Sequence, residues 1–159
     1  MPEVLFYHLT RSPIEATLPE LLEKTLARGW KALVRGGDRK RLDWLDGKLW
    51  AGDTGFLPHG LAGGPHDADQ PVLLTTGADA PNRADILFAI DRAEVSVAEA
   101  QGFQRVCILF DGNANSAVEF ARGQWSALAG AGLPSKYWSQ ESGSWQVKAS
   151  KNIAPPASA

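Results

Sequence analysis

The sequence contains little cysteine and no long apolar run. Cys107 is the single cysteine among 159 residues, so no disulfide can close within the chain. No segment carries the run of about 20 apolar residues that spans a bilayer as a helix. The first residues, MPEVLFYHL, lack the basic-then-apolar layout of a secretory signal peptide. These absences predict a cytoplasmic protein with no membrane association.

An excess of positive charge is missing as well. The chain has 16 Lys and Arg against 18 Asp and Glu, a net charge of -2, which argues against a protein whose whole surface attracts nucleic acid or membrane. The basic residues are unevenly placed, however. Residues 28–48 hold seven Lys or Arg against three Asp, and residues 121–151 hold four against one Glu. Two local basic patches are therefore expected.

The common nucleotide-binding motifs are also absent. The first apolar run leads into YHLTRSP, which has no glycine to let a backbone approach a pyrophosphate, and G-x-x-x-x-G-K-[ST] occurs nowhere. Gly130 and Gly132 follow a helical segment, which is typical of a helix C-cap. A small nucleotide-binding or hydrolytic α/β enzyme stays an alternative, using the strand ends near His8 and Asp111.

What the sequence does contain is a regular alternation of apolar runs and helical periods. Strand-type runs occupy 4–9, 30–36, 71–76, 85–90, 106–110 and 136–140, and helical periods fill a segment between Pro13 and Gly29, then 38–50 and 113–132. This order predicts one α/β domain over residues 1–148, with an open, mostly parallel twisted sheet and helices on both faces, Rossmann-like but without a phosphate-binding loop. Residues 149–159 are expected to form a disordered tail.

Two histidines lie close to two carboxylates in the middle of the chain. His59, His66, Asp67 and Asp69 are ligand types that zinc accepts. Their spacing matches no established ligand pattern, and no cysteine accompanies them. We therefore expect no metal and no cofactor, and histidines that form local hydrogen bonds.

The last long helical segment places a cation beside an indole. Arg122, Trp125 and Ser126 are spaced i, i+3, i+4 and share one helix face. In one interpretation Trp125 packs at the boundary between helix and sheet and Arg122 is merely solvated. In the other, the two form a socket for a peptide with an apolar residue and acidic groups, in which the guanidinium binds a carboxylate.

More aromatic and basic residues follow towards the end of the chain. Trp138 and Trp145 alternate with Lys136 and Lys148. Such residues also stack on and neutralise single-stranded nucleic acid. Direct binding of single-stranded DNA is a weaker alternative, because the net charge is negative.

The segment LWAGDTGFLPHGLAGG (49–64) is apolar, yet its glycines disfavour a stable helix or strand. Either Phe56 and Leu61 fold back over a sheet edge or helix end, or the segment is an exposed docking surface for a partner.

The order of elements and several motifs resemble one known family. FYHL near the start, FLPHGLAG from Phe56 to Gly63, an A-R-x-x-W helix and a terminal aromatic and basic segment are similar to the chi subunit of bacterial DNA polymerase III. The resemblance covers roughly residues 3–148, and its most specific part is FLPHGLAG.

The resemblance implies a non-catalytic adaptor in DNA replication. Chi binds the acidic C-terminal tail of single-stranded DNA-binding protein, and thus associates with single-stranded DNA indirectly. It also pairs with the psi subunit, which tethers it to the clamp loader, and in some bacteria with a helicase-like repair protein.

The resemblance also implies two sets of site residues. In the tail pocket Arg122 and Trp125 match the family, whereas Ser126 stands in the place of a lysine. The lost cation should weaken tail binding unless Lys136 or Lys148 compensates. Docking of psi or another partner falls on four mid-chain residues: Trp50, Phe56, Pro58 and Leu61.

Overall fold

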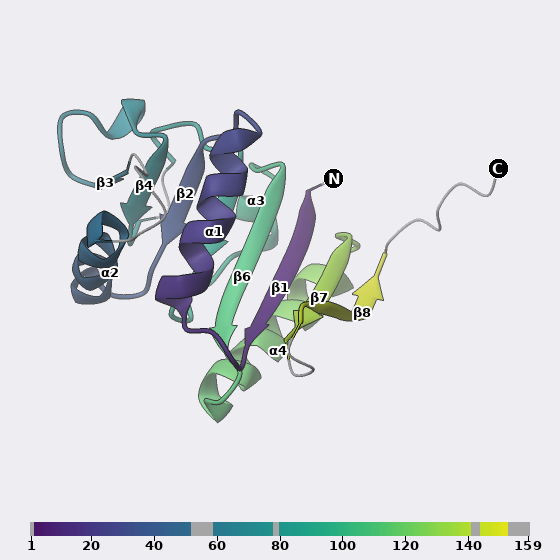
Figure 1. The fold of residues 1–159 in the computed structure, drawn as a ribbon. Helices are drawn as coiled ribbons and strands as arrows, with labels where there is room; N and C mark the ends of the chain where they lie inside the picture. Colours follow the sequence, from purple (N-terminus) through teal and green to yellow (C-terminus); the bar gives the residue numbers. More distant parts are fainter. Residues whose placement is uncertain (1, 52–58, 78–79, 141–143, 153–159) are drawn as a thin grey trace.

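Strands and helices alternate along the chain, as the apolar pattern predicts. The computed structural model describes residues 2–51, 59–77, 80–140 and 144–152. The elements are β1 (Glu3–Leu9), α1 (Ile14–Ala27), β2 (Ala32–Arg35), α2 (Arg39–Ala51), β3 (Gly60–Leu61), a 3-10 turn (Asp67–Asp69), β4 (Val72–Thr75), β5 (Ile86–Ala89), α3 (Val97–Ala100), β6 (Arg105–Asp111), α4 (Asn115–Gly130), β7 (Ser135–Ser139) and β8 (Gln146–Lys151) (Figure 1).

The described strands form one sheet in the order β3-β4-β2-β5-β6-β1-β7-β8. All neighbouring strands are parallel except β7 and β8, which are antiparallel. Helix α1 crosses one face of the sheet, while α3 and α4 lie behind it (Figure 1). The chain therefore has the predicted α/β fold, an open and mostly parallel sheet covered by helices on both faces.

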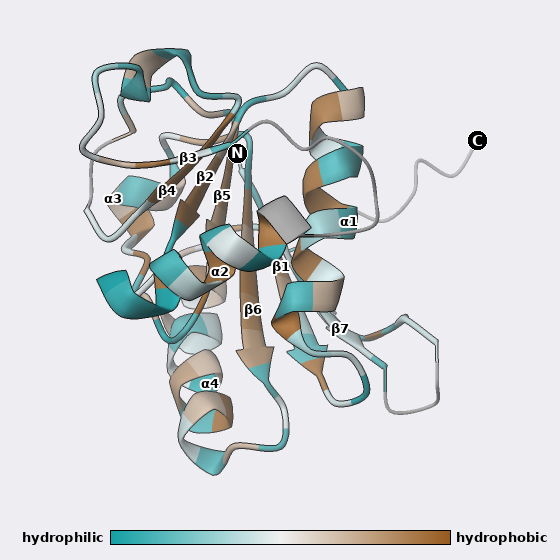
Figure 2. Cartoon of the chain, turned by 60° about the vertical axis from the view of Figure 1, so that its left-hand side comes forward, coloured by the Kyte–Doolittle hydropathy of each residue, from teal (hydrophilic) through white to brown (hydrophobic). Residues whose placement is uncertain are grey.

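Each face of the sheet carries its own hydrophobic core. Val4 and Phe6 of β1 pack with Leu128 of α4 on one face, and Leu5 of β1 packs with Leu22 of α1 on the other. Because side chains alternate along a strand and both faces are covered, the inner strands β2, β4, β5 and β6 are apolar at every position except their ends. Figure 2 shows these strands as the most hydrophobic part of the fold.

The apolar pattern does not predict four of the described elements. Strand β3 has two residues, the 3-10 turn has three and α3 has four, which are too few to show a period. Strand β8 is exposed at all its positions, so it has no buried side to leave a pattern. It runs to Lys151, past residue 148 where the domain was expected to end. Residues 153–159 of the expected tail lie outside the described residues.

A buried arginine at the carboxyl end of β2 joins α3 to the loop that follows β4. Arg35 is 5% exposed. Its Nη1 lies 2.8 Å from Glu99 Oε2, and its Nε donates to the Gly77 carbonyl at 3.0 Å. The same Glu99 forms a capping box with Ser96 at the start of α3. A charge buried to this degree needs such a partner, because an unpaired one is strongly destabilising.

The surroundings of Glu99 favour its charged form. Burial alone would raise the pKa of its carboxyl, but hydrogen bonds from Ser96 and the charge of Arg35 outweigh burial and lower the pKa below the ordinary value of 4.5. A lowered pKa in the folded state means that Glu99 stabilises the fold fully above about pH 4.5. This contribution is lost as the pH falls below that value.

We therefore predict that Glu99→Gln lowers the free energy of unfolding near pH 7 and that the difference from the unmodified chain shrinks below about pH 4.5. Urea unfolding at a series of pH values measures this. Glu94→Gln is a matched control, because the Glu94 side chain is exposed on the segment that precedes α3. A difference that stays constant from pH 7 to pH 3 would contradict the role given to the Glu99 charge.

Candidate functional site

The predicted peptide socket lies on one flank of α4. This helix buries Ala117, Ala121, Gln124 and Leu128 against the sheet. Its small residues let it approach the strands closely. The flank next to the buried stripe carries Arg122, Trp125 and Ser126, which the i, i+3, i+4 spacing brings together.

The indole of Trp125 packs on two aromatic rings of the sheet. Its centroid lies 5.3 Å from that of Phe6 in β1 and 6.3 Å from that of Tyr137 in β7, with steep angles between the ring planes of 61° and 78°. Edge-to-face contacts of this kind stabilise an aromatic cluster. Trp125 is half-buried, so part of the ring still faces solvent. The indole therefore packs at the boundary between helix and sheet and also forms a fixed apolar surface there.

The polar members of the socket remain accessible. Arg122 and Ser126 are exposed, and neither side chain has a hydrogen bond or ion pair with a described residue. A guanidinium in this state can bind a carboxylate without first breaking another pair. The structure thus places the three predicted residues on one surface, with a cation beside a rigid indole.

The later aromatic residues do not join this surface. Trp138 and Trp145 pack against the core on the opposite face of the sheet, where Trp145 meets Tyr7 edge-on at 5.4 Å between ring centroids. Lys136 lies on that face too, with Nζ 3.8 Å from Glu3 Oε1. The aromatic and basic residues of the last segment are therefore divided between two faces and do not form one stacking platform with Trp125.

Only part of the predicted docking segment can be located. Phe56 and Pro58 lie outside the described residues, and Trp50 lies in α2 with a side chain that is not described. Leu61 is in β3, where it pairs with Leu74 and packs half-buried against the core under α1 and α2. For Leu61 the structure therefore agrees with the interpretation in which the segment folds back over a sheet edge.

His59 belongs to this segment, and the unexpected Trp44 lies on α2, which leads into it. His59 is buried, and its Nε2 lies 3.0 Å from Asp46 Oδ1, a contact that joins the segment to α2. Trp44 of α2 is 36% exposed. The Arg41 guanidinium carbon lies 4.5 Å from the Trp44 ring centroid. The i, i+3 spacing of these two residues could have revealed the pair from the sequence.

His8 and Asp111, on which the alternative of a nucleotide-binding or hydrolytic enzyme depends, do not form one site. His8 Nδ1 lies 2.8 Å from the Tyr137 hydroxyl, and the ring stacks on Phe110 with centroids 5.1 Å apart. Gly112 lies against the same ring, so closely that no Cβ would fit there. Asp111 is exposed and accepts a hydrogen bond from the Asn113 backbone. His8 is thus engaged inside an aromatic cluster, away from the cleft that Asp111 lines.

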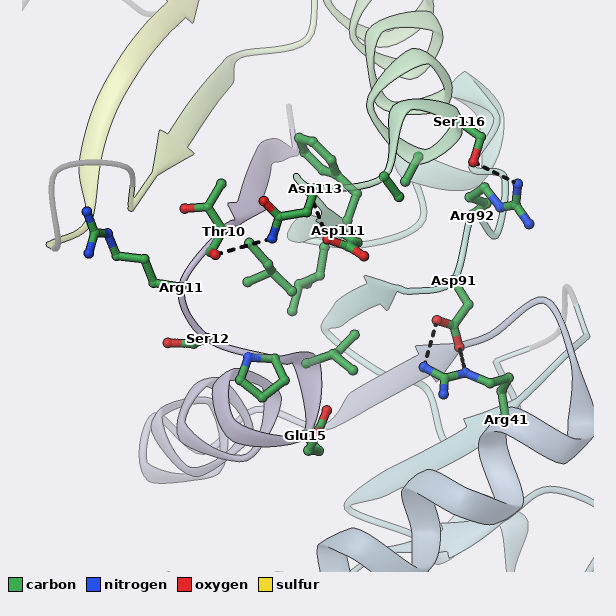
Figure 3. Close-up of a pocket in the computed structure, with 17 residues that line it drawn as sticks. Thr10, Arg11, Ser12, Glu15, Arg41, Asp91, Arg92, Asp111, Asn113 and Ser116 are labelled. Carbon is green, nitrogen blue, oxygen red and sulfur yellow. Dashed lines mark hydrogen bonds and ion pairs between the residues drawn. The ribbon is translucent and has the colours of Figure 1, made fainter.

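That cleft, about 530 Å³ in volume, lies where β1 and β6 end and lead to helices on opposite faces (Figure 3). Ligands of doubly wound sheets usually bind at this position, on backbone N–H groups that follow a strand. Here the N–H groups of Thr10, Arg11 and Ser12 all donate to one atom, Gln140 Oε1, at 2.9 to 3.0 Å. The loop that would hold a phosphate is therefore already bound by the protein itself.

The metal alternative has no support in the described part of the chain. No group of three or more His, Cys, Asp or Glu there is arranged to hold a metal ion. The Asp67 carboxylate accepts hydrogen bonds from the backbone N–H groups of Gly63 and Gly64, and His66 is exposed.

Among the described helices, none is both long and apolar enough to cross a membrane.

Comparison with known proteins gives one consistent result. The family model described as DNA polymerase III chi subunit, HolC, matches residues 1–136. A curated relative, named as a probable DNA polymerase III subunit chi of Rickettsia prowazekii (strain Madrid E), is 26% identical over 117 residues, which are 70% of this chain and 71% of that protein. The family match ends early in β7, so β8 lies beyond it.

The Gln140 contact gives a test of how the strand-end loop is held. Gln140→Ala leaves three backbone N–H groups without their acceptor and should lower the free energy of unfolding by about 2 kcal/mol. Gln140→Glu keeps an acceptor oxygen on a side chain of the same length, so it should lower the free energy of unfolding by less. Urea unfolding at neutral pH measures both variants. Equal stability of Gln140→Ala and the unmodified chain would show that the three hydrogen bonds are not needed.

Proposed function

Since the chain belongs to the family of DNA polymerase III chi subunits, we propose that it is a non-catalytic replication adaptor. It binds the acidic C-terminal tail of single-stranded DNA-binding protein and links this protein to the clamp-loader complex. The observation that carries the proposal is the exposed Arg122 beside the fixed indole of Trp125. Its association with single-stranded DNA is indirect, and it acts in the cytoplasm.

The surface on α4 suits a peptide that ends in an apolar residue and a free carboxylate. Phe6 and Tyr137 fix the Trp125 ring before any ligand arrives, so the ring loses little conformational entropy on binding. An apolar side chain can pack on the accessible part of that ring. The Arg122 guanidinium can then bind the neighbouring carboxylate through paired hydrogen bonds.

A second partner docks at the far edge of the sheet. The resemblance assigns this contact to Trp50, Phe56, Pro58 and Leu61, and the psi subunit or an equivalent clamp-loader or helicase-like protein is the proposed partner. Leu61 packs half-buried against the core, so only part of its side chain is accessible to a partner. The preceding residues, Phe56 above all, make the contact. The exposed indole of Trp44 lies on the helix that leads into this segment.

We predict that a peptide copied from the acidic tail binds with a micromolar Kd that rises with salt, because the main contact is between charges. Arg122→Ala should raise the Kd about tenfold or more, since hydrogen bonds to charged groups contribute about 1.5 to 3 kcal/mol. Isothermal titration calorimetry at low and moderate salt measures both.

Two controls accompany this titration. Lys24→Ala removes an exposed cation from α1, on the opposite face of the sheet, and should leave the Kd unchanged. A peptide with an amidated C-terminus should bind the unmodified chain about as weakly as the free acid binds Arg122→Ala. Equal affinity of Arg122→Ala and the unmodified chain would refute this binding site.

The docking proposal has a separate test. Phe56→Ala should weaken association with the psi subunit of the same organism about tenfold or more, as expected for an aromatic anchor at an interface, while leaving the Kd for the tail peptide unchanged. Calorimetry with purified psi measures the first effect. Trp44→Ala is the matched control, because Trp44 is an exposed aromatic residue of α2 and is not one of the residues that the resemblance assigns. Full psi binding by Phe56→Ala would rule out this contact.

A further inference from the structure

Strand β8 forms the outer edge of the sheet next to the surface on α4. It pairs antiparallel with β7, with Tyr137 opposite Ala149 and Ser135 opposite Lys151. Residues directly opposite each other in a sheet project to the same face. Because the Tyr137 ring contacts Trp125 of α4, Ala149 lies on the α4 face. Lys151 follows two positions later and therefore lies on that face as well.

The end of β8 is fastened to the end of α4. Asn152 Nδ2 donates to the carbonyls of Ala129 and Leu133, at 2.7 and 2.9 Å. Asn152 has a left-handed backbone with φ of 59°, a conformation that asparagine adopts more readily than most residues. Ala129 belongs to the last turn of α4 and Leu133 to the segment just after it, and their carbonyls also accept from the Gly132 N–H and the Ser135 hydroxyl. The two Asn152 hydrogen bonds thus hold Lys151 close to the carboxyl-terminal half of α4.

Few basic residues lie on the α4 face of the sheet, which β8 borders. Arg122 is the only basic residue between positions 115 and 130. Lys136 of β7 does not add to it, because it lies on the opposite face with Glu3. Lys148 falls at the irregularity of the β7 and β8 register, where it has no residue opposite. Lys151 is thus the cation that the strand register assigns to the α4 face.

We infer that β8 is the second wall of the peptide-binding surface and that Lys151 is its second cation. The inference rests on the proposed function, in which α4 binds an acidic tail. A peptide with several carboxylates lies between the two walls, one carboxylate on Arg122 and another on Lys151. Ser126 supplies no charge on α4, and β8 supplies it instead. Since β8 lies beyond residues 1–136, this wall is outside the part of the chain that matches the family.

The test uses the full chain and the acidic tail peptide in calorimetric titrations. Lys151→Ala should raise the Kd about three- to fivefold at low salt, the range expected for one exposed charge pair, and should reduce its dependence on salt. Lys136→Ala is the matched control: it removes a lysine from the same strand pair, but on the other face, and should leave the Kd unchanged. The double variant Ser126→Lys, Lys151→Ala should bind the peptide as tightly as the unmodified chain, because it places the second cation on α4 instead of β8.

The outcomes separate this inference from the function on which it rests. If Lys151→Ala binds like the unmodified chain while Arg122→Ala does not bind, the role of β8 is refuted and the adaptor function stands. Equal weakening by Lys151→Ala and Lys136→Ala would also refute it, because only overall charge would then matter. If the unmodified chain fails to bind the peptide at low salt, the proposed function and this inference fall together.

Discussion

Strand β1 pairs with β6 on one side and β7 on the other, and this double pairing positions the rings that support Trp125. Its alternating side chains serve both faces at once: Phe6 supports Trp125 under α4, and Leu5 enters the core beneath α1. The parallel register places Phe6 opposite Tyr137 of β7. A shift of one residue would reverse these faces and remove the support of the indole. The position of the indole in the proposed peptide-binding surface is therefore set by the core strands beneath it.

The sequence predicts most of the fold because the inner strands and the three long helices have strong apolar patterns. VCILF and PVLLTT become buried strands, and the A-R-x-x-W period becomes the exposed flank of α4. The same spacing that predicts a shared face for Arg122 and Trp125 is realised in the helix. The order of elements together with FLPHGLAG carries the resemblance to the chi family, and the family model over residues 1–136 confirms it.

The contacts that the sequence does not predict are polar and distant along the chain. Gln140 holds the loop after β1 from about 130 positions away, and no local pattern relates the two. Strand β8 is exposed throughout, so nothing in its hydrophobicity separates it from a loop. Its position is set by pairing with β7 and by the Asn152 hydrogen bonds. The division of Trp125 and Trp138 between two faces likewise depends on strand register, which composition alone does not reveal.

The placement of the two proposed surfaces bears on how an adaptor of this size can work. Leu61 belongs to β3 at one edge of the sheet, whereas Tyr137 and Lys151 belong to β7 and β8 at the other (Figure 1). At about 4.8 Å between neighbouring strands, these edges are on the order of 30 Å apart. Partners bound at opposite edges need not compete for the same residues. The sheet between them consists of strands buried on both faces, so its core sets the spacing of the two edges. In the proposed adaptor function, the fold therefore acts as a spacer between the two partners.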